Sequence, residues 1–115
     1  MKEFLPGLQK ALDLAGNLHT LQDVADQIKA GKAQLWTSEN ACIVSEVLTY
    51  PRAKVLHYWL ACGEKEAVIA LSRDVLAWGK GIGCTAASLA GRRGWERALK
   101  DEGWAPQLVY MTRGV

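Results

Sequence analysis

The segment "GEKEAVIALSRDVLAWGKGIG", residues 63–83, decides which fold the sequence predicts. Its large apolar residues recur at the spacing of a helix and share one face: Val68, Leu71, Val75 and Leu76. Two glutamates lie at the start of the segment and Lys80 lies near its end, as the helix dipole favours. The segment therefore predicts an amphipathic helix that ends in glycines.

The glycine cluster "WGKGIGC", residues 78–84, also has the composition of a phosphate-binding loop. Glycines let backbone N–H groups approach a pyrophosphate, provided that the loop follows a strand and precedes a helix. Here the helix comes first, and the carbonyl groups at its C-terminal end would repel an anion. We therefore expect Gly79, Gly81 and Gly83 to form a helix stop and a tight turn.

A second parse of this region reads residues 67–78 as a strand and residues 84–99 as one long helix. The polar residues 72–74 would interrupt that strand. Gly91 and Gly94 would each cost about 1 kcal/mol inside that helix. The first parse is therefore preferred.

Two helices are expected at the N-terminal end. Residues 4–14 form the first, with Pro6 in its first turn, where a missing N–H group costs little. The second helix begins after Thr20, which has Asp23 three residues later in a capping-box pattern. Gly31 can adopt the left-handed conformation that ends this helix.

Three strands are expected next, in residues 33–39, 41–50 and 55–62. These stretches are rich in β-branched and aromatic side chains, and polar turns separate them. They predict an antiparallel meander.

The C-terminal third predicts a strand, a helix and a strand. The first strand covers residues 84–91, and a helix within residues 92–104 stops at Gly103. Residues 106–113, "PQLVYMTR", form the last strand.

The order of elements is therefore helix, helix, three strands, helix, strand, helix, strand. This order predicts an α+β fold, a mixed sheet flanked by helices on both faces. The 115 residues, half of them apolar, suffice for one core and leave no room for a second. We therefore expect a single domain over residues 1–115.

Composition excludes several classes of function. The net charge of +2 argues for no polyanionic partner. The N-terminal stretch carries Glu3, Pro6 and Asp13, so it is neither a signal peptide nor a membrane span. We expect a soluble, intracellular protein with no membrane partner.

Three cysteines and two histidines are the candidates for thiol or metal chemistry. Cys42, Cys62 and Cys84 stand about twenty residues apart and form no CxxC pair, which indicates reduced thiols. With only His19 and His57 to complete it, a metal centre would lack ligands, and we expect none. A cysteine–histidine nucleophile pair stays open.

Three stretches and the order of elements resemble the GNAT acetyltransferase superfamily. The stretches are "AQLWTSENACIVSEV" (33–47), "LACGEKEAVIALSRDVLAWGKGIGC" (60–84) and "GRRGWERALKDEGW" (91–104). More narrowly, they resemble small GNAT-like proteins encoded in phages and prophages. The resemblance covers nearly the whole chain and implies a GNAT-like fold.

The resemblance implies a position for acetyl-CoA. In the superfamily its pyrophosphate sits on a loop of pattern Arg/Gln-x-x-Gly-x-Gly/Ala, between a central strand and the following helix. The corresponding residues 60–68 offer Gly63 but no Arg or Gln at the expected place. Glu64 and Glu66 would meet the pyrophosphate with like charge.

The same pattern can be placed on the glycine cluster. Gly81 and Gly83 are then in register, but Trp78 stands where Arg or Gln belongs. If the protein binds acetyl-CoA, the candidate cofactor-binding residues are Gly63, Gly79, Gly81 and Gly83. Otherwise no cofactor is expected.

The resemblance also implies a carboxylate base on the central strands and a tyrosine near the last helix that protonates the leaving thiolate. Glu46 is the candidate base if its side chain points into the cleft. Gly103 and Trp104 follow the last helix where the tyrosine would stand, and Tyr58 and Tyr110 are expected to pack on strands. We therefore expect a GNAT-like fold without a working acetyl-CoA site.

A candidate interaction surface surrounds the last helix. Five tryptophans are many for 115 residues, and exposed aromatic side chains mark contact surfaces. Basic residues gather near two of them, as in sites for an acidic protein surface or a nucleic-acid backbone. The residues of this surface are Arg92, Arg93, Trp95, Arg97 and Trp104.

Three functions follow from these observations. The first is a phage-encoded, catalytically inactive GNAT-like protein that contacts a protein partner or a second copy of itself. It would act in the virion, in particle assembly or as an accessory factor in the host cytoplasm. The alternative is an acetyl-CoA-dependent N-acetyltransferase. A weaker alternative is a nucleic-acid or host-factor binder, whose affinity would fall steeply with salt.

Overall fold

In the computed structural model, which describes residues 2–91 and 94–115, the segment that decides the fold is a helix. Helix α3 spans Lys65–Gly81 and buries Val68, Leu71 and Val75 along one side. Gly83 follows the helix with a φ of 95°. The prediction of a helix with a glycine stop is confirmed, and the parse with a strand at this position is wrong.

The N-terminal helix pair also forms as predicted. A short 3-10 turn precedes helix α1 (Leu5–Leu14), which has its proline in the first turn. Helix α2 (Leu21–Lys29) begins with a capping box. The Thr20 hydroxyl oxygen accepts from the Asp23 N–H at 3.1 Å, and the Asp23 carboxylate accepts from the Thr20 N–H at 2.8 Å.

Four strands form one sheet in the order β1-β2-β3-β4. Strands β1 (Gln34–Thr37), β2 (Ala41–Tyr50) and β3 (Ala53–Gly63) make the predicted antiparallel meander. Strand β4 (Ala86–Leu89) runs parallel to β3. The α+β class with a mixed sheet is therefore confirmed.

A bulge in β3 changes which side chains face which helices. Val44 and Ser45 are consecutive in β2 but pair with Leu60 and Tyr58, so Trp59 is an extra residue. Before the bulge, Tyr58 points toward α3; after it, Leu60 points toward α1. This shift explains why an apolar run, rather than strict alternation, marks this strand in the sequence.

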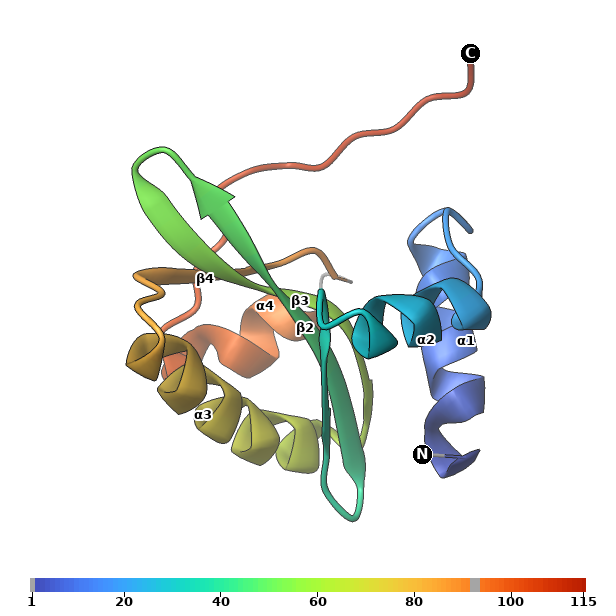
Figure 1. Ribbon diagram of the computed structural model, residues 1–115, viewed down its shortest axis with the longest axis horizontal. Coiled ribbons are helices and arrows are strands. Elements are labelled where there is room, and N and C mark those ends of the chain that lie inside the picture. The colour runs from blue at the N-terminus through green and yellow to red at the C-terminus, as the bar shows by residue number, and fades with distance from the viewer. Residues whose placement is uncertain (1, 92–93) are drawn as a thin grey trace.

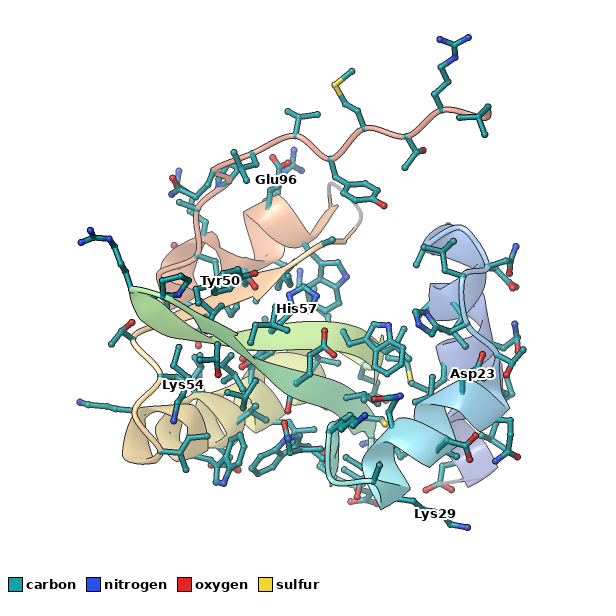
Figure 2. The ribbon with its side chains drawn as sticks, turned by 45° about the horizontal axis from the view of Figure 1, so that its top comes forward. Asp23, Lys29, Tyr50, Lys54, His57 and Glu96 are labelled. Atoms are coloured by element: carbon teal, nitrogen blue, oxygen red, sulfur yellow. The ribbon has the colours of Figure 1, made fainter. Side chains whose placement is uncertain are left out.

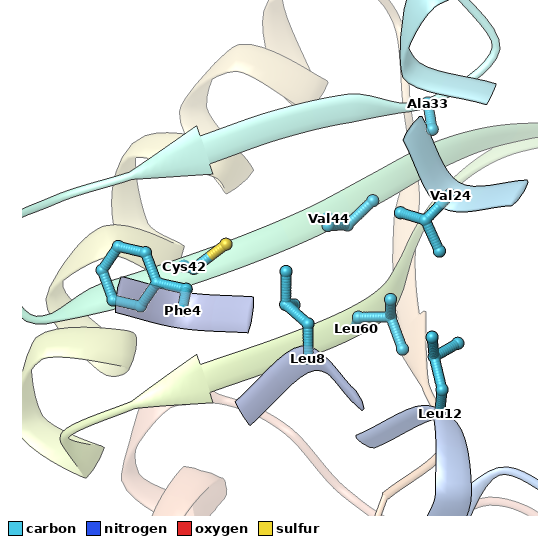
Figure 3. Close-up of a cluster of buried hydrophobic side chains, with 8 residues drawn as sticks. All are labelled: Phe4, Leu8, Leu12, Val24, Ala33, Cys42, Val44 and Leu60. Atoms are coloured by element: carbon cyan, nitrogen blue, oxygen red, sulfur yellow. The ribbon is translucent and has the colours of Figure 1, made fainter. Parts of the chain in front are cut away.

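Each face of the sheet carries its own apolar core, with α1 and α2 on one side and α3 on the other (Figure 1). Figure 3 shows the first core, in which Leu8 and Leu12 of α1 pack against Val44 and Leu60 of the sheet. The second core joins Ile43, Leu56 and Tyr58 of the sheet to α3. The predicted placement of helices on both faces is confirmed.

The last helix ends as its glycine predicts. Helix α4 (Gly94–Leu99) continues into a 3-10 turn, and Gly103 follows with a φ of 89°. The Trp104 N–H then donates to the carbonyl oxygen of Leu99 at 3.3 Å.

The predicted last strand is wrong. The chain after Gly103 forms no strand, and it runs away from the body in an extended course (Figure 1). Tyr110, expected to pack on a strand, is exposed. Strand propensity is expressed only where a neighbouring strand supplies hydrogen bonds and packing, and no described strand lies beside these residues. The element order therefore ends with the last helix.

Candidate functional site

The two positions considered for a cofactor loop lie at opposite ends of α3. Gly63 precedes the N-terminus of this helix, and Gly83 follows its C-terminus. A helix of 17 residues is about 25 Å long. Gly63 and the glycine cluster therefore cannot belong to one binding site.

The glycine cluster closes the C-terminal end of α3. Gly79 is buried, and a Cβ atom built there would lie 2.8 Å from Cδ2 of Leu56, so this glycine lets the helix approach β3. Gly81 is the last residue of the helix. The Lys54 ammonium group donates a 2.9 Å hydrogen bond to the carbonyl oxygen of Ile82. The cation stabilises the negative end of the helix dipole.

At the other end of α3, one residue separates strand from helix. β3 ends at Gly63 and α3 begins at Lys65, with Glu64 between them. Gly63 has a φ of 121° and packs against the backbone of Asn40. The Glu64 N–H donates a 2.9 Å hydrogen bond to the carbonyl oxygen of Asn40. The turn before β2 thus holds this junction closed.

Two open hollows flank the junction and carry carboxylates. One, of about 300 Å³, lies between the turn before β2 and α3, and Glu39 and Asp74 are among its lining residues. The other, of about 360 Å³, lies between the same turn and α1, and its lining includes Glu3, Glu39 and Glu64. Carboxylates give both hollows a negative potential, which disfavours phosphate groups.

A second group of functional side chains crosses the open part of the sheet. Glu46 of β2 pairs in register with His57 of β3, and His57 pairs with Ser88 of β4. Nδ1 of His57 lies 2.8 Å from Oγ of Ser88, within hydrogen-bonding distance. Neighbours of His57 and Ser88 along their strands point into the core under α3, so these two side chains face the opposite side of the sheet. Figure 2 shows this for His57.

Burial controls the proton affinity of His57. Desolvation lowers the pKa of His57 below its ordinary 6.5, and the nearby Glu46 carboxylate partly offsets that effect. The imidazole is therefore held neutral near pH 7 and can accept a proton. The sequence marks Glu46 as a candidate base and His57 only as a partner for a thiol or a metal. The cross-strand register, which places His57 and Ser88 beside Glu46, is seen only in the tertiary fold.

The candidate interaction surface is only partly within the described residues, because Arg92 and Arg93 lie outside them. Arg97 is exposed on α4. Trp95 and Trp104 are half-buried and pack against the core under α3, where the Trp104 ring lies 5.4 Å from the Tyr58 ring. A contact of these residues with a partner stays a prediction.

The remaining candidates from the sequence are the three thiols and a metal site. Cys42, Cys62 and Cys84 are free, and Cys42 pairs in register with Cys62 across β2 and β3. Within residues 2–91 and 94–115, no group of three His, Cys, Asp or Glu side chains is placed to hold a metal ion. In that same part of the chain, no helix has the length and apolar character to cross a membrane.

Two comparisons by sequence found no match for this chain. No protein-family model matches the chain. No curated protein matches it by sequence.

Solved structures match over nearly the whole chain. An acetyltransferase of Trypanosoma brucei superposes with a TM-score of 0.71 at 12% identity, over 100% of this chain and 95% of that one. A protein of Thermus thermophilus gives 0.64 at 21% identity, over 100% and 92%. The glucosamine-6-phosphate N-acetyltransferase of Arabidopsis thaliana gives 0.59 at 14% identity, over 94% and 92%. These likenesses show that the chain has the fold of the GNAT acetyltransferases.

Proposed function

We propose that this GNAT-fold protein acts through contacts with other proteins and does not transfer acetyl groups. The single observation that carries the proposal is the connection between β3 and α3, which consists of Glu64 alone. The pyrophosphate loop of the superfamily is a six-residue pattern, and one residue cannot supply it. The N–H of this residue is moreover engaged by Asn40.

Electrostatics support the same proposal. Glu64 precedes the first turn of α3, Glu66 lies within it, and Glu39 lines both adjoining hollows. A pyrophosphate at this place would face carboxylates where an enzyme places backbone N–H groups and arginine. The residues at the junction therefore do not fit acetyl-CoA.

The sequence resemblance gives the biological setting of the proposal. The chain resembles phage- and prophage-encoded GNAT-like proteins, so the protein would serve a phage in the virion, in assembly or as an accessory factor in the host cytoplasm. Partner contacts would use Arg97, which is exposed on α4, together with Arg92 and Arg93, which lie outside the described residues.

A titration tests the proposal. Purified protein is titrated with CoA and with acetyl-CoA by calorimetry, and thermal unfolding is followed at the same ligand concentrations. We expect no heat of binding and no shift in Tm at millimolar ligand. Saturable binding in the micromolar range would overturn the proposal, and the double variant Glu64→Gln, Glu66→Gln would then show whether these carboxylates weaken it.

One observation favours a second function, acyl transfer to an amine. The row of Glu46, His57 and Ser88 places a neutral imidazole between a carboxylate and a hydroxyl group. In such a reaction His57 would accept the proton of the attacking amine, and the Glu46 carboxylate would stabilise the resulting imidazolium ion. Glu64 makes no side-chain cap at the first turn of α3, so an acyl donor bound there would have to overcome the charge of the nearby carboxylates.

This second function has its own test. Release of free CoA from acetyl-CoA is measured with a panel of primary amines for the wild type and for His57→Gln. Turnover that falls at least about 100-fold in His57→Gln supports acyl transfer. The variant His19→Gln removes the other, exposed histidine and is the matched control. Turnover that is equal in all three proteins would exclude His57 as the base.

A further inference from the structure

The C-terminal tail, residues 105–115, exposes an unusual run of apolar side chains. Leu108, Val109, Tyr110 and Met111 are 92%, 80%, 74% and 83% exposed. Single exposed apolar residues are normal on a protein surface, but four in succession mark a contact site. Val109 is β-branched and Tyr110 is aromatic, and side chains of these two kinds suit a strand.

The sheet offers an edge for such a strand. β4 is the last strand in the sheet order, so no described strand pairs with its outer edge. Its four residues, "AASL", include no charged residue and no proline. Exposed edges are normally protected by charges, prolines or bulges, because unpaired N–H and C=O groups invite another strand. The unprotected edge of β4 therefore indicates that another strand covers it.

We infer that the tail of one chain adds as a strand to β4 of a second copy, and that the second copy returns its own tail in the same way. In this structure the tail leaves the body and does not turn back along β4 (Figures 1 and 2). Each chain thus carries both the unpaired strand and the unpaired edge. A two-fold exchange pairs both at once and closes into a dimer.

The area involved is that of a stable dimer. A large apolar side chain removes roughly 100 Å² from water when it is buried. Four such side chains from each tail, together with the surfaces that they cover, reach roughly 1,500 Å² in total, within the range of specific interfaces. Four consecutive apolar residues also suit a strand that is covered on both faces. The inference concerns self-association alone and does not rest on the proposed function.

Crosslinking between distinguishable chains tests the exchange. Unlabelled chains and chains labelled with heavy nitrogen are mixed at about 100 μM, each with photoreactive benzoylphenylalanine in place of Tyr110. After irradiation, mass spectrometry identifies which peptide is joined to the tail and whether its label matches. The mass of the wild type in solution is measured by light scattering in parallel.

The expected result is a dimer of twice the 12.6 kDa chain, with mixed-label crosslinks between the tail and the peptide that contains β4. Tyr110→Asp should weaken this dimer by at least about 30-fold. Leu18→Asp, which alters an exposed leucine between α1 and α2, is the matched control and should leave the dimer unchanged. A monomeric wild type, crosslinks within one chain only, or a dimer that survives Tyr110→Asp would each overturn the inference.

Discussion

Nδ1 of His57 lies 2.8 Å from the Ser88 hydroxyl oxygen, and this contact joins side chains of two strands that are parallel neighbours in the sheet. Glu46 stands beside His57 on the opposite flank. Glu46 and His57 belong to the two strands of one hairpin, whereas Ser88 lies 31 residues after His57 in the sequence. Their juxtaposition places a carboxylate, an imidazole and a hydroxyl group in one row across three strands.

The first prediction concerns pH. Burial lowers the pKa of His57 below 6.5, so below that pH the unfolded chain binds a proton that the folded chain resists. The stabilising contribution is therefore complete above pH 6.5 and declines as the pH falls. Between pH 7.5 and 5.0, the free energy of unfolding measured with denaturant should decline less for His57→Gln than for the wild type. An equal decline in the two proteins would contradict the lowered pKa of His57. His19→Gln controls for the loss of one histidine.

The second prediction concerns the close approach of α3 to β3. Gly79→Val adds a side chain whose Cβ atom alone would lie 2.8 Å from buried Leu56, so the free energy of unfolding should fall by about 1–3 kcal/mol. Gly81→Val is the matched control, because its Cβ position meets nothing within 4 Å apart from its own chain neighbours and helix backbone. Chemical denaturation measures both variants. Equal effects at the two positions would show that the cluster is not packed against the sheet.

The third prediction concerns the junction between β3 and α3. Gly63→Ala forces a side chain into a φ of 121° and against the backbone of Asn40 and Ala41, which should cost about 3 kcal/mol or more. Gly31→Ala has a φ of 75° but open space, so it should cost only about 1–2 kcal/mol. Thermal and denaturant unfolding distinguish the two variants. A milder loss at Gly63 would mean that the junction is looser than described.

The fourth prediction concerns thiol reactivity. Burial raises the pKa of Cys42 to about 12 and also raises that of Cys62, so little of either thiol is ionised at pH 8. In the folded protein both should react far more slowly with a disulfide reagent than they do in guanidinium chloride. Peptide mapping by mass spectrometry after timed labelling gives the rate for each cysteine. Rapid labelling of Cys42 in the native protein would contradict its burial.

Local patterns determined much of the fold. The capping residues Thr20 and Asp23 predict where a helix begins, and Gly83 and Gly103 predict where helices end, because these signals act within a few residues. The change of period at residues 63–83 likewise predicts α3. Such features need no distant partner, and the structure confirms them.

The last strand shows where local patterns fail. Residues 106–113 have the composition of a strand, yet the described chain places no partner beside them. A helix satisfies its own backbone, whereas a strand depends on a neighbour that the sequence does not name. The outer edge of β4 and the exposed tail both lack a neighbouring strand within the described residues.

The sequence by itself determined the helices, the antiparallel meander and the role of the glycine cluster as a helix stop. It also placed carboxylates, whose charge disfavours pyrophosphate, at the start of α3. The tertiary structure alone decided that Glu64 is the whole connection between β3 and α3, that Trp59 is bulged, and that His57 meets Ser88. The reason is physical. Helix stops and turns follow from interactions within a few residues, whereas strand register and cross-strand contacts depend on how segments distant in the chain pack together.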